Sequence, residues 1–87
     1  MDFILHKSFK KALRKQSRKV QLRFFQRIEL FENDPFHPTL DNHALSGRWK
    51  HHRSIDITGD VRAVYITYIE IKGVAVFIDI GTHSQLY

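Results

Sequence analysis

The last seven residues, Gly81–Tyr87, contain two side chains that can take part in proton transfer. His83 carries an imidazole, which accepts or donates a proton near neutral pH, and Tyr87 carries a phenol that can donate one. Both groups can also bind a phosphate. Histidines near a chain end are more often simply solvated, so the residue types alone leave a catalytic and a structural interpretation of this tail open.

Arg62 places a permanent positive charge on an otherwise apolar strand face. In the alternation of a strand, its side chain points the same way as those of Val64, Ile66 and Tyr68. A guanidinium in that setting needs an anionic partner, which is either a carboxylate of the same chain or the phosphate of a ligand. The candidate carboxylates are Asp56, Asp60 and Asp79.

The segment from residue 48 to residue 53 mixes basic and aromatic side chains. Such a mixture can hold phosphates and stack on a nucleic-acid base. An ordinary solvated strand end with Trp49 in the core fits the same sequence equally well. The basic members are Arg48, Lys50 and Arg53, and His52 stands among them.

The chain contains six histidines and no cysteine, which excludes disulfides and thiolate metal sites. His51 and His52 are neighbours on a predicted strand and project to opposite faces, so a shared zinc ion is not expected. The other candidates, His6, His37 and His43, lack a recognised ligand spacing. We expect neither a metal nor a cofactor.

Two helices are predicted in the N-terminal part of the chain. Ser8 is a candidate N-cap for a short basic helix, whose apolar residues recur at three- and four-residue spacing. Ser17 is a second candidate N-cap and is followed by a longer apolar stripe. Pro35 forces the preceding residue out of helical geometry, so this second helix should end near Asn33 and give way to an irregular stretch up to about Asn42.

Four strands are predicted around these helices, because short apolar, β-branched and aromatic runs flank them. Turns are expected at Thr58–Asp60 and at Lys72–Gly73. The strands are predicted at residues 3–5, 49–57, 61–69 and 74–80.

The order of these elements, strand, helix, helix, strand, strand, strand, indicates an α+β fold. It predicts a mainly antiparallel four-stranded sheet with the two helices on one face and a site on the other. In the second strand, Ile55 and Ile57 point to one face. The opposite, polar face carries Lys50, His52, Ser54 and Asp56.

Length and charge limit the possible organisation. The 87 residues are expected to form a single domain, 1–87, because so short a chain cannot divide its core in two. Fourteen Lys and Arg against nine Asp and Glu give a net charge of +5, and nine of the fourteen lie in residues 1–33, which favours an acidic partner. No run approaches the ~20 apolar residues of a membrane span, and the start has no secretory leader pattern, so we expect a soluble cytoplasmic protein without membrane contact.

Three stretches of the sequence together resemble a known family of bacterial toxins. They are His43–Lys50 (HALSGRWK), Asp60–Tyr65 (DVRAVY) and Gly81–Tyr87 (GTHSQLY). Over nearly its whole length the chain is similar to YafQ-like and RelE-like toxins of the RelE/ParE superfamily, and the closing stretch is the most specific part. The resemblance implies a RelE-like fold, with an active cleft on the sheet face that the helices leave open.

The resemblance also implies roles for individual residues. His83 matches the catalytic tail histidine of YafQ-like toxins, and Tyr87 matches their closing aromatic residue. His43 matches the histidine before the Leu-x-Gly segment, and Asp60 matches the acidic position of the hairpin. Arg62 resembles instead the active-site arginine of RelE-like members, so the chain mixes features of two branches.

Two positions depart from the YafQ-like pattern. Asp56 stands where these toxins have a further histidine, and Ile80 stands where they have an arginine. The departures leave the division of roles among the site residues open.

The activity that the resemblance implies is ribosome-dependent cleavage of mRNA, by metal-free attack of a 2′-hydroxyl on the adjacent phosphate. In this scheme His83 transfers a proton, with Asp60 or His43 as the opposite partner. Arg62 stabilises the phosphate and Tyr87 stacks on a base or orients it. The candidate RNA-binding residues are Arg48, Lys50, His52, Arg53 and Asp56.

Two other functions remain open at this point. A ParE-like toxin of the same fold would inhibit DNA gyrase and leave RNA intact, and a non-catalytic RNA- or ribosome-binding module would bind without cleavage. For a toxin, the expected partners are a cognate antitoxin that folds on the basic surface, mRNA with the ribosome, and operator DNA for the toxin–antitoxin complex.

Overall fold

The polypeptide is built around one mixed β-sheet. The computed structural model describes residues 1–87, the whole chain. Its strands are β1 (Asp2–Leu5), β2 (His43–Ala44), β3 (His52–Asp56), β4 (Val61–Tyr68) and β5 (Ile71–Thr82). Its helices are α1 (Lys7–Arg14), α2 (Arg18–Asn33) and α3 (His83–Leu86), with two 3-10 turns, η1 (Pro38–Leu40) and η2 (Gly47–Trp49).

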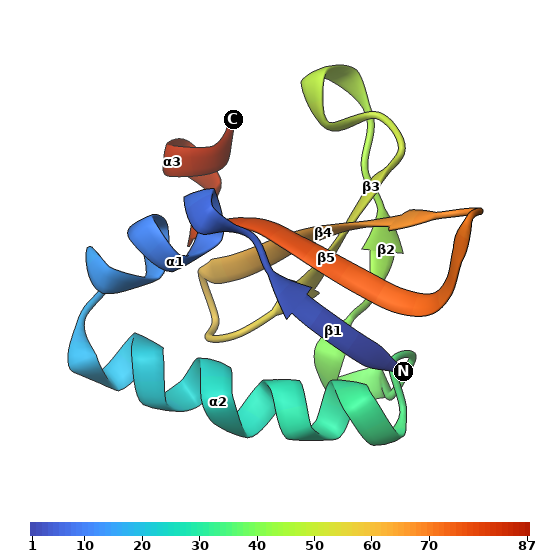
Figure 1. Cartoon of the computed structure of the whole chain (residues 1–87). Helices are drawn as coiled ribbons and strands as arrows, with labels where there is room; N and C mark the ends of the chain where they lie inside the picture. The colour runs from blue at the N-terminus through green and yellow to red at the C-terminus, as the bar shows by residue number, and fades with distance from the viewer.

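The strands lie in the order β1-β5-β4-β3-β2, with β1 parallel to β5 and the other pairs antiparallel (Figure 1). The predicted α+β class and mainly antiparallel sheet are therefore confirmed. The predicted number of four strands is one too few, because β2 was not foreseen. A strand of two residues is too short to leave an alternating pattern in the sequence.

The helices begin at polar residues, although one of these is not the residue predicted. Ser17 caps α2 as predicted, since its hydroxyl accepts a hydrogen bond of 3.2 Å from the backbone N–H three residues on. At α1 the cap is His6 rather than Ser8, because the His6 Nδ1 accepts from Ser8 N at 3.1 Å. The Ser8 hydroxyl instead donates to the carbonyl of Ile78 at 2.7 Å and ties α1 to β5.

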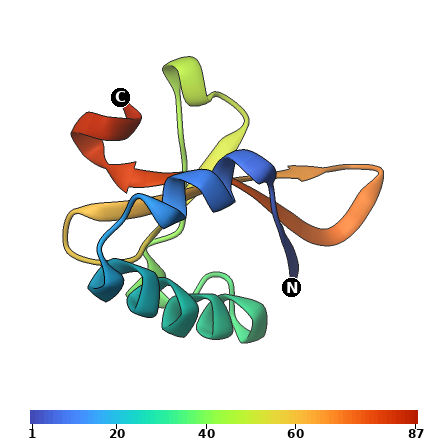
Figure 2. The ribbon, with the colours of Figure 1, turned by 60° about the vertical axis from the view of Figure 1, so that its left-hand side comes forward.

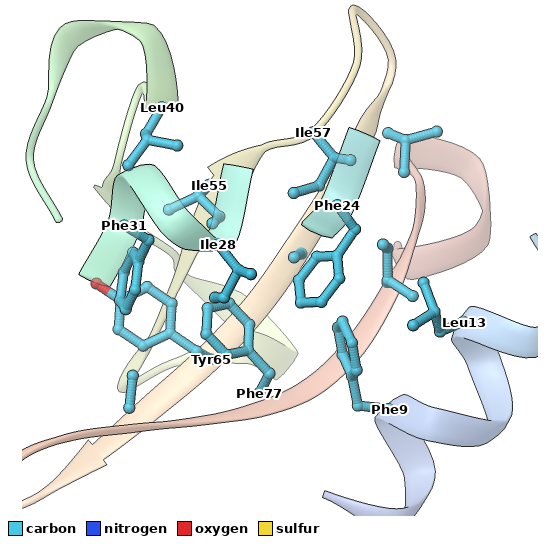
Figure 3. Close-up of a cluster of buried hydrophobic side chains, with 14 residues drawn as sticks. Phe9, Leu13, Phe24, Ile28, Phe31, Leu40, Ile55, Ile57, Tyr65 and Phe77 are labelled. Atoms are coloured by element: carbon cyan, nitrogen blue, oxygen red, sulfur yellow. The ribbon is translucent and has the colours of Figure 1, made fainter. Parts of the chain in front are cut away.

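The main core lies between α1, α2 and one face of the sheet (Figure 3). Phe77 of β5 contacts five aromatic rings at centroid distances between 5.2 and 6.4 Å. Those rings belong to Phe3, Phe9, Phe24, Phe31 and Tyr65. Ile55 and Ile57 are fully buried in the same core, as the strand alternation predicts.

The turn that joins the two long strands β4 and β5 was predicted at the wrong position. The predicted turn around Thr58–Asp60 joins β3 to β4, but the predicted turn at Lys72–Gly73 is wrong, because Ile69 and Glu70 join β4 to β5. Gly73 instead has a φ of +75° at a register irregularity within β5, so this glycine marks a bulge. The β4–β5 hairpin projects beyond the rest of the sheet (Figure 2).

None of the helices combines the length and the apolar character needed to cross a bilayer.

Candidate active site

A row of polar side chains lies on the sheet face away from the main core, where β2, β3 and β4 run side by side. The strand register sets His43 opposite Ser54, and Asp56 opposite Arg62. Because alternate residues of a strand share a face, Ser54 and Asp56 point to the side opposite the buried Ile55. The polar face predicted for this strand is confirmed for Ser54 and Asp56, and β2 adds His43 to it. The predicted strand start at residue 49 is wrong, because Gly47–Trp49 forms η2 and β3 begins at His52, so Lys50 lies before the strand.

The backbone beside His43 holds its ring in one tautomer. The Nδ1 atom lies 2.8 Å from the carbonyl oxygen of Asp41, and a carbonyl can only accept, so Nδ1 carries the proton. The lone pair therefore lies on Nε2, which faces Arg62 Nη1 at 3.4 Å and Ser54 Oγ at 3.5 Å. Both contacts are long for hydrogen bonds, so Nε2 can still accept a proton from another group.

Arg62 also faces a carboxyl group whose acidity is altered. Its Nε lies 3.7 Å from Asp56 Oδ1, an oxygen that is shielded from solvent and has no hydrogen-bond partner. Burial raises the pKa of the Asp56 carboxyl above its ordinary value, although the charge of Arg62 acts in the opposite direction. The guanidinium has five donors, so this one loose contact leaves most of them for a second anion.

Arg62 in addition lines an open, polar pocket of about 430 Å³. None of the lining residues is hydrophobic, and they are Gly59, Asp60, Arg62, Thr82, His83 and Ser84. Asp60 is held in the turn by Thr58, whose hydroxyl donates to Oδ1 at 3.1 Å. The pocket therefore combines a carboxylate, a guanidinium and an imidazole, and Arg62 connects it to His43.

Four of the tail residues form α3 (His83–Leu86), a short helix that the sequence analysis did not predict. His83 is its first residue, and Thr82 caps it by accepting a hydrogen bond from Gln85 N at 3.2 Å. The rings of His83 and Tyr87 lie 4.7 Å apart at an angle of 42°. Both side chains are exposed, so the imidazole is accessible to a ligand although it lies beside the Tyr87 ring.

Trp49 anchors the basic segment beside α3. Its indole Nε1 donates to the carbonyl of Leu86 at 2.9 Å, and its buried ring packs against Val64 and Leu86. Both views show this segment and α3 on the side of the sheet opposite α2 (Figures 1 and 2). The polar side chains that it carries there are Arg48, Lys50 and His52.

Arg53 is not brought together with these side chains, contrary to the expected grouping. It pairs with Tyr65 across β3 and β4 and points to the helix-covered face. Its Nε donates to Asn42 Oδ1 at 2.8 Å, and its guanidinium lies 5.2 Å from the centre of the Phe36 ring. The physical reason is that a step of one residue along a strand reverses the face.

Two residues of the site were not singled out as site residues from the sequence. Asp41 has left-handed backbone geometry, with φ 44° and ψ 49°, from which its carbonyl reaches His43. Ser54 is fully buried, and the hydrogen-bond partner of its hydroxyl is His43. The neighbouring pair Asp41 and Asn42 was the available signal, because both residue types tolerate left-handed geometry. No group of three or more histidine or acidic side chains lies close enough to hold a metal ion.

Comparison with known proteins assigns the fold to a family. The whole chain, residues 1–87, matches the model described as bacterial toxin of type II toxin–antitoxin system, YafQ. The chain belongs to this family. The resemblance to YafQ-like toxins stated from the three sequence stretches is thereby confirmed.

Solved structures of several toxins share the fold of this chain. A toxin from Helicobacter pylori, solved as a copper-bound mutant, is 28% identical with a TM-score of 0.67, over 100% of this chain and 99% of that one. The E. coli DinJ–YafQ complex matches at 19% identity and a TM-score of 0.68, over 99% of this chain and 97% of that one. A YoeB/ParE toxin from Agrobacterium tumefaciens matches at 18% identity and a TM-score of 0.73, over 95% of this chain and 99% of that one. The last two are similar in fold alone. A comparison with curated protein sequences gives no match.

Proposed function

We propose that this type II toxin is an endoribonuclease that cuts mRNA on the ribosome and so inhibits translation, without a metal or another cofactor. The observation that carries the proposal concerns Arg62, which contacts His43 Nε2 at 3.4 Å and lines one pocket with His83. Cleavage of RNA by its own 2′-hydroxyl needs a base, an acid and a cation beside the phosphate. These three side chains supply one of each.

In the proposed reaction, His43 acts as the base. Its Nε2 lone pair takes the proton of the 2′-hydroxyl, and the freed oxygen attacks the adjacent phosphorus. The bond from phosphorus to the 5′-oxygen breaks, and protonated His83 gives its proton to that leaving oxygen. The products are a 2′,3′-cyclic phosphate and a 5′-hydroxyl end. His43 has gained one proton and His83 has lost one.

The neighbouring residues have supporting roles in the proposal. Arg62 stabilises the extra negative charge of the phosphorane, and Asp60 lines the same pocket as His83. Tyr87, whose ring lies tilted beside that of His83, offers a ring to a base. Arg48, Lys50 and His52 hold the RNA backbone beside α3, and Asp56 keeps Arg62 in place.

The proposed regulator is a cognate antitoxin. The E. coli YafQ relative is known in complex with DinJ, and the net charge of +5 of this chain suits an acidic segment that folds on its surface. The toxin–antitoxin complex is proposed to bind its operator DNA, and the site of action is the cytoplasm, where ribosomes translate mRNA.

The test is primer extension on a translated mRNA in cells that express the wild type or His83→Gln. We expect cuts within the reading frame that require translation and that fall by about 10²-fold or more in the variant, since proton transfer contributes that much. Full cleavage by His83→Gln would contradict the role of this residue.

A parallel gyrase supercoiling assay separates the alternatives. Gyrase inhibition without RNA cuts would support a ParE-like toxin, whose fold this chain also matches. Ribosome binding with neither effect would support a non-catalytic binding module.

A further inference from the structure

The helix that carries His83 is too short to be stable by itself. α3 has four residues, and an isolated helix of that length does not form in water. The position of His83 therefore depends on contacts between α3 and the rest of the chain. These contacts occur at two places, the first turn and the last residue of the helix.

At the first turn, the Gln85 side chain accepts two hydrogen bonds. Its Oε1 accepts a hydrogen bond of 2.8 Å from Thr82 N, which completes a capping box. The same oxygen accepts a second hydrogen bond, of 3.3 Å, from Gln16 Nε2. Gln16 follows α1, and its Nε2 also faces the carbonyl of Ile80 at 3.4 Å. The side-chain amide of Gln16 thus bridges the end of β5 and α3.

The backbone of Gln16 is itself fixed. Gln21 of α2 donates through Nε2 to the carbonyl of Gln16 at 3.0 Å and to that of Leu13 at 3.1 Å. Both N-terminal helices therefore support the bridging amide. At the other end of α3, Leu86 is buried and its carbonyl accepts from Trp49 Nε1 at 2.9 Å.

We propose that Gln16 and Gln85 form a latch that docks α3 and so positions His83 for the cleavage proposed above, on which this inference rests. Neither residue touches the pocket that Arg62 and His83 line, so both are positioning residues. The latch lies on the α1 side of α3 and couples the catalytic tail to the basic N-terminal helices.

The hydrogen bonds of the latch have a fixed direction. A carbonyl can only accept, so Gln16 presents its amide nitrogen to Ile80, and the backbone N–H of Thr82 requires an oxygen from Gln85. Gln16 is therefore a donor and Gln85 is an acceptor. A glutamate can replace the acceptor and cannot replace the donor, so the same substitution has opposite consequences at the two positions.

The experiment uses the chain's single tryptophan as a reporter of docking. In the 15N-labelled full-length protein, the only indole N–H signal belongs to Trp49, whose proton is bonded to α3. We expect Gln16→Glu and Gln85→Met to speed hydrogen exchange of this proton about fivefold or more, in line with the loss of a helix cap. Gln85→Glu should exchange at the wild-type rate.

Cleavage of ribosome-bound mRNA should follow the same order, with Gln85→Glu active and the other two variants slower by a similar factor. The melting temperature of each variant shows whether the rest of the fold is intact. Wild-type exchange and cleavage in Gln16→Glu, or equal damage by Gln85→Glu and Gln85→Met, would overturn the latch. If His83→Gln cleaves normally, the proposed catalytic role fails, whereas the indole signal still tests docking independently.

Discussion

At the scale of single residues, the candidate site depends on which nitrogen and which oxygen each side chain presents. In the proposed mechanism His43 can act as the base because the Asp41 carbonyl occupies Nδ1 and leaves the lone pair on Nε2. The same mechanism needs Arg62 free to bind the phosphate, and its contact with the Asp56 carboxylate is a loose one of 3.7 Å. Small changes of donor or acceptor should therefore alter activity more than changes of size.

The first prediction concerns the guanidinium of Arg62. Arg62→Ala should lower the rate of mRNA cleavage by about 10²–10³-fold, the usual cost of removing a group that stabilises charge in the transition state. Arg62→Lys should recover only part of the loss, because an ammonium keeps the charge without the planar fork. Single-turnover cleavage on programmed ribosomes measures both.

Arg53→Lys is the matched control for Arg62→Lys. Its guanidinium lies on the opposite face of the sheet, bonded to Asn42. The same chemical change should therefore reduce cleavage far less at Arg53 than at Arg62. Equal losses at the two positions would contradict the division of the sheet into a core face and an active face.

A second prediction concerns pH and Asp56. Burial raises the pKa of this carboxyl in the folded state, so the folded chain binds more protons than the unfolded chain between the ordinary and the raised value. Stability should fall as pH rises through that window. Asp56→Asn should lose this part of the pH dependence, and its stability relative to the wild type should increase with pH.

Urea unfolding at several pH values measures the effect. The slope of the unfolding free energy against pH should differ between the wild type and Asp56→Asn within this window. The difference corresponds to at most one bound proton. Asp60→Asn, at an exposed carboxylate of the adjacent turn, is the control and should show no such relative gain. A relative gain for Asp60→Asn and none for Asp56→Asn would contradict the assignment.

At the scale of elements, α3 shows why a short helix escapes sequence analysis. Four residues span little more than one helical turn, so no apolar period can be seen, and its stabilising contacts come from Gln16 and Trp49, both distant in the chain. The longer elements were predictable for the opposite reason. The helix α2 could be predicted because its N-cap, Ser17, and its apolar stripe both lie within the same stretch of sequence.

A third prediction tests the close approach at the base of α3. A Cβ at Gly81 would lie 2.8 Å from Gln85 Oε1 and 3.0 Å from Gln85 Cβ. Gly81→Ala should therefore displace Gln85 and destabilise the protein by about 1–3 kcal/mol, as overpacking does. Thermal unfolding and the exchange of the Trp49 indole proton measure the two effects.

Gly59→Ala is the control for this prediction. A Cβ at Gly59 meets nothing within 4 Å, so this substitution should change the unfolding free energy by less than about 0.5 kcal/mol. Destabilisation of both variants to the same extent would show that close packing against Gln85 is not the cause.

At the scale of the whole molecule, the site depends on a core built around one residue. Phe77 contacts rings from β1, α1, α2 and β4, so it holds together the elements that carry the sheet. A fourth prediction is that Phe77→Ala costs about 3–5 kcal/mol of the 5–15 kcal/mol that stabilises a typical domain. Phe25→Ala, at a ring 52% exposed, should cost less than about 1 kcal/mol in the same urea titration.

The overall architecture of the molecule was easier to predict from the sequence than its irregular parts. The fold class followed from the order of the elements, whereas the polar face with Ser54 and Asp56 and the buried Ile55 and Ile57 followed from the period of a strand. The position of Gly73 in a bulge could not be predicted, because a bulge and a turn use the same residue types. The contact between His43 and Arg62 joins β2 to β4, and such pairings depend on register, which composition and spacing do not determine.

The measurement that tests the central claim most directly uses one mRNA in two forms on ribosomes programmed with it. One form is all RNA, and the other has a single 2′-deoxynucleotide at the position of a mapped cut. If His43, Arg62 and His83 direct the 2′-hydroxyl onto the neighbouring phosphate, the cut at that position should disappear in the deoxy form while other cuts persist. Cleavage at the deoxy position at the normal rate would contradict the account, because no 2′-oxygen is then present to attack.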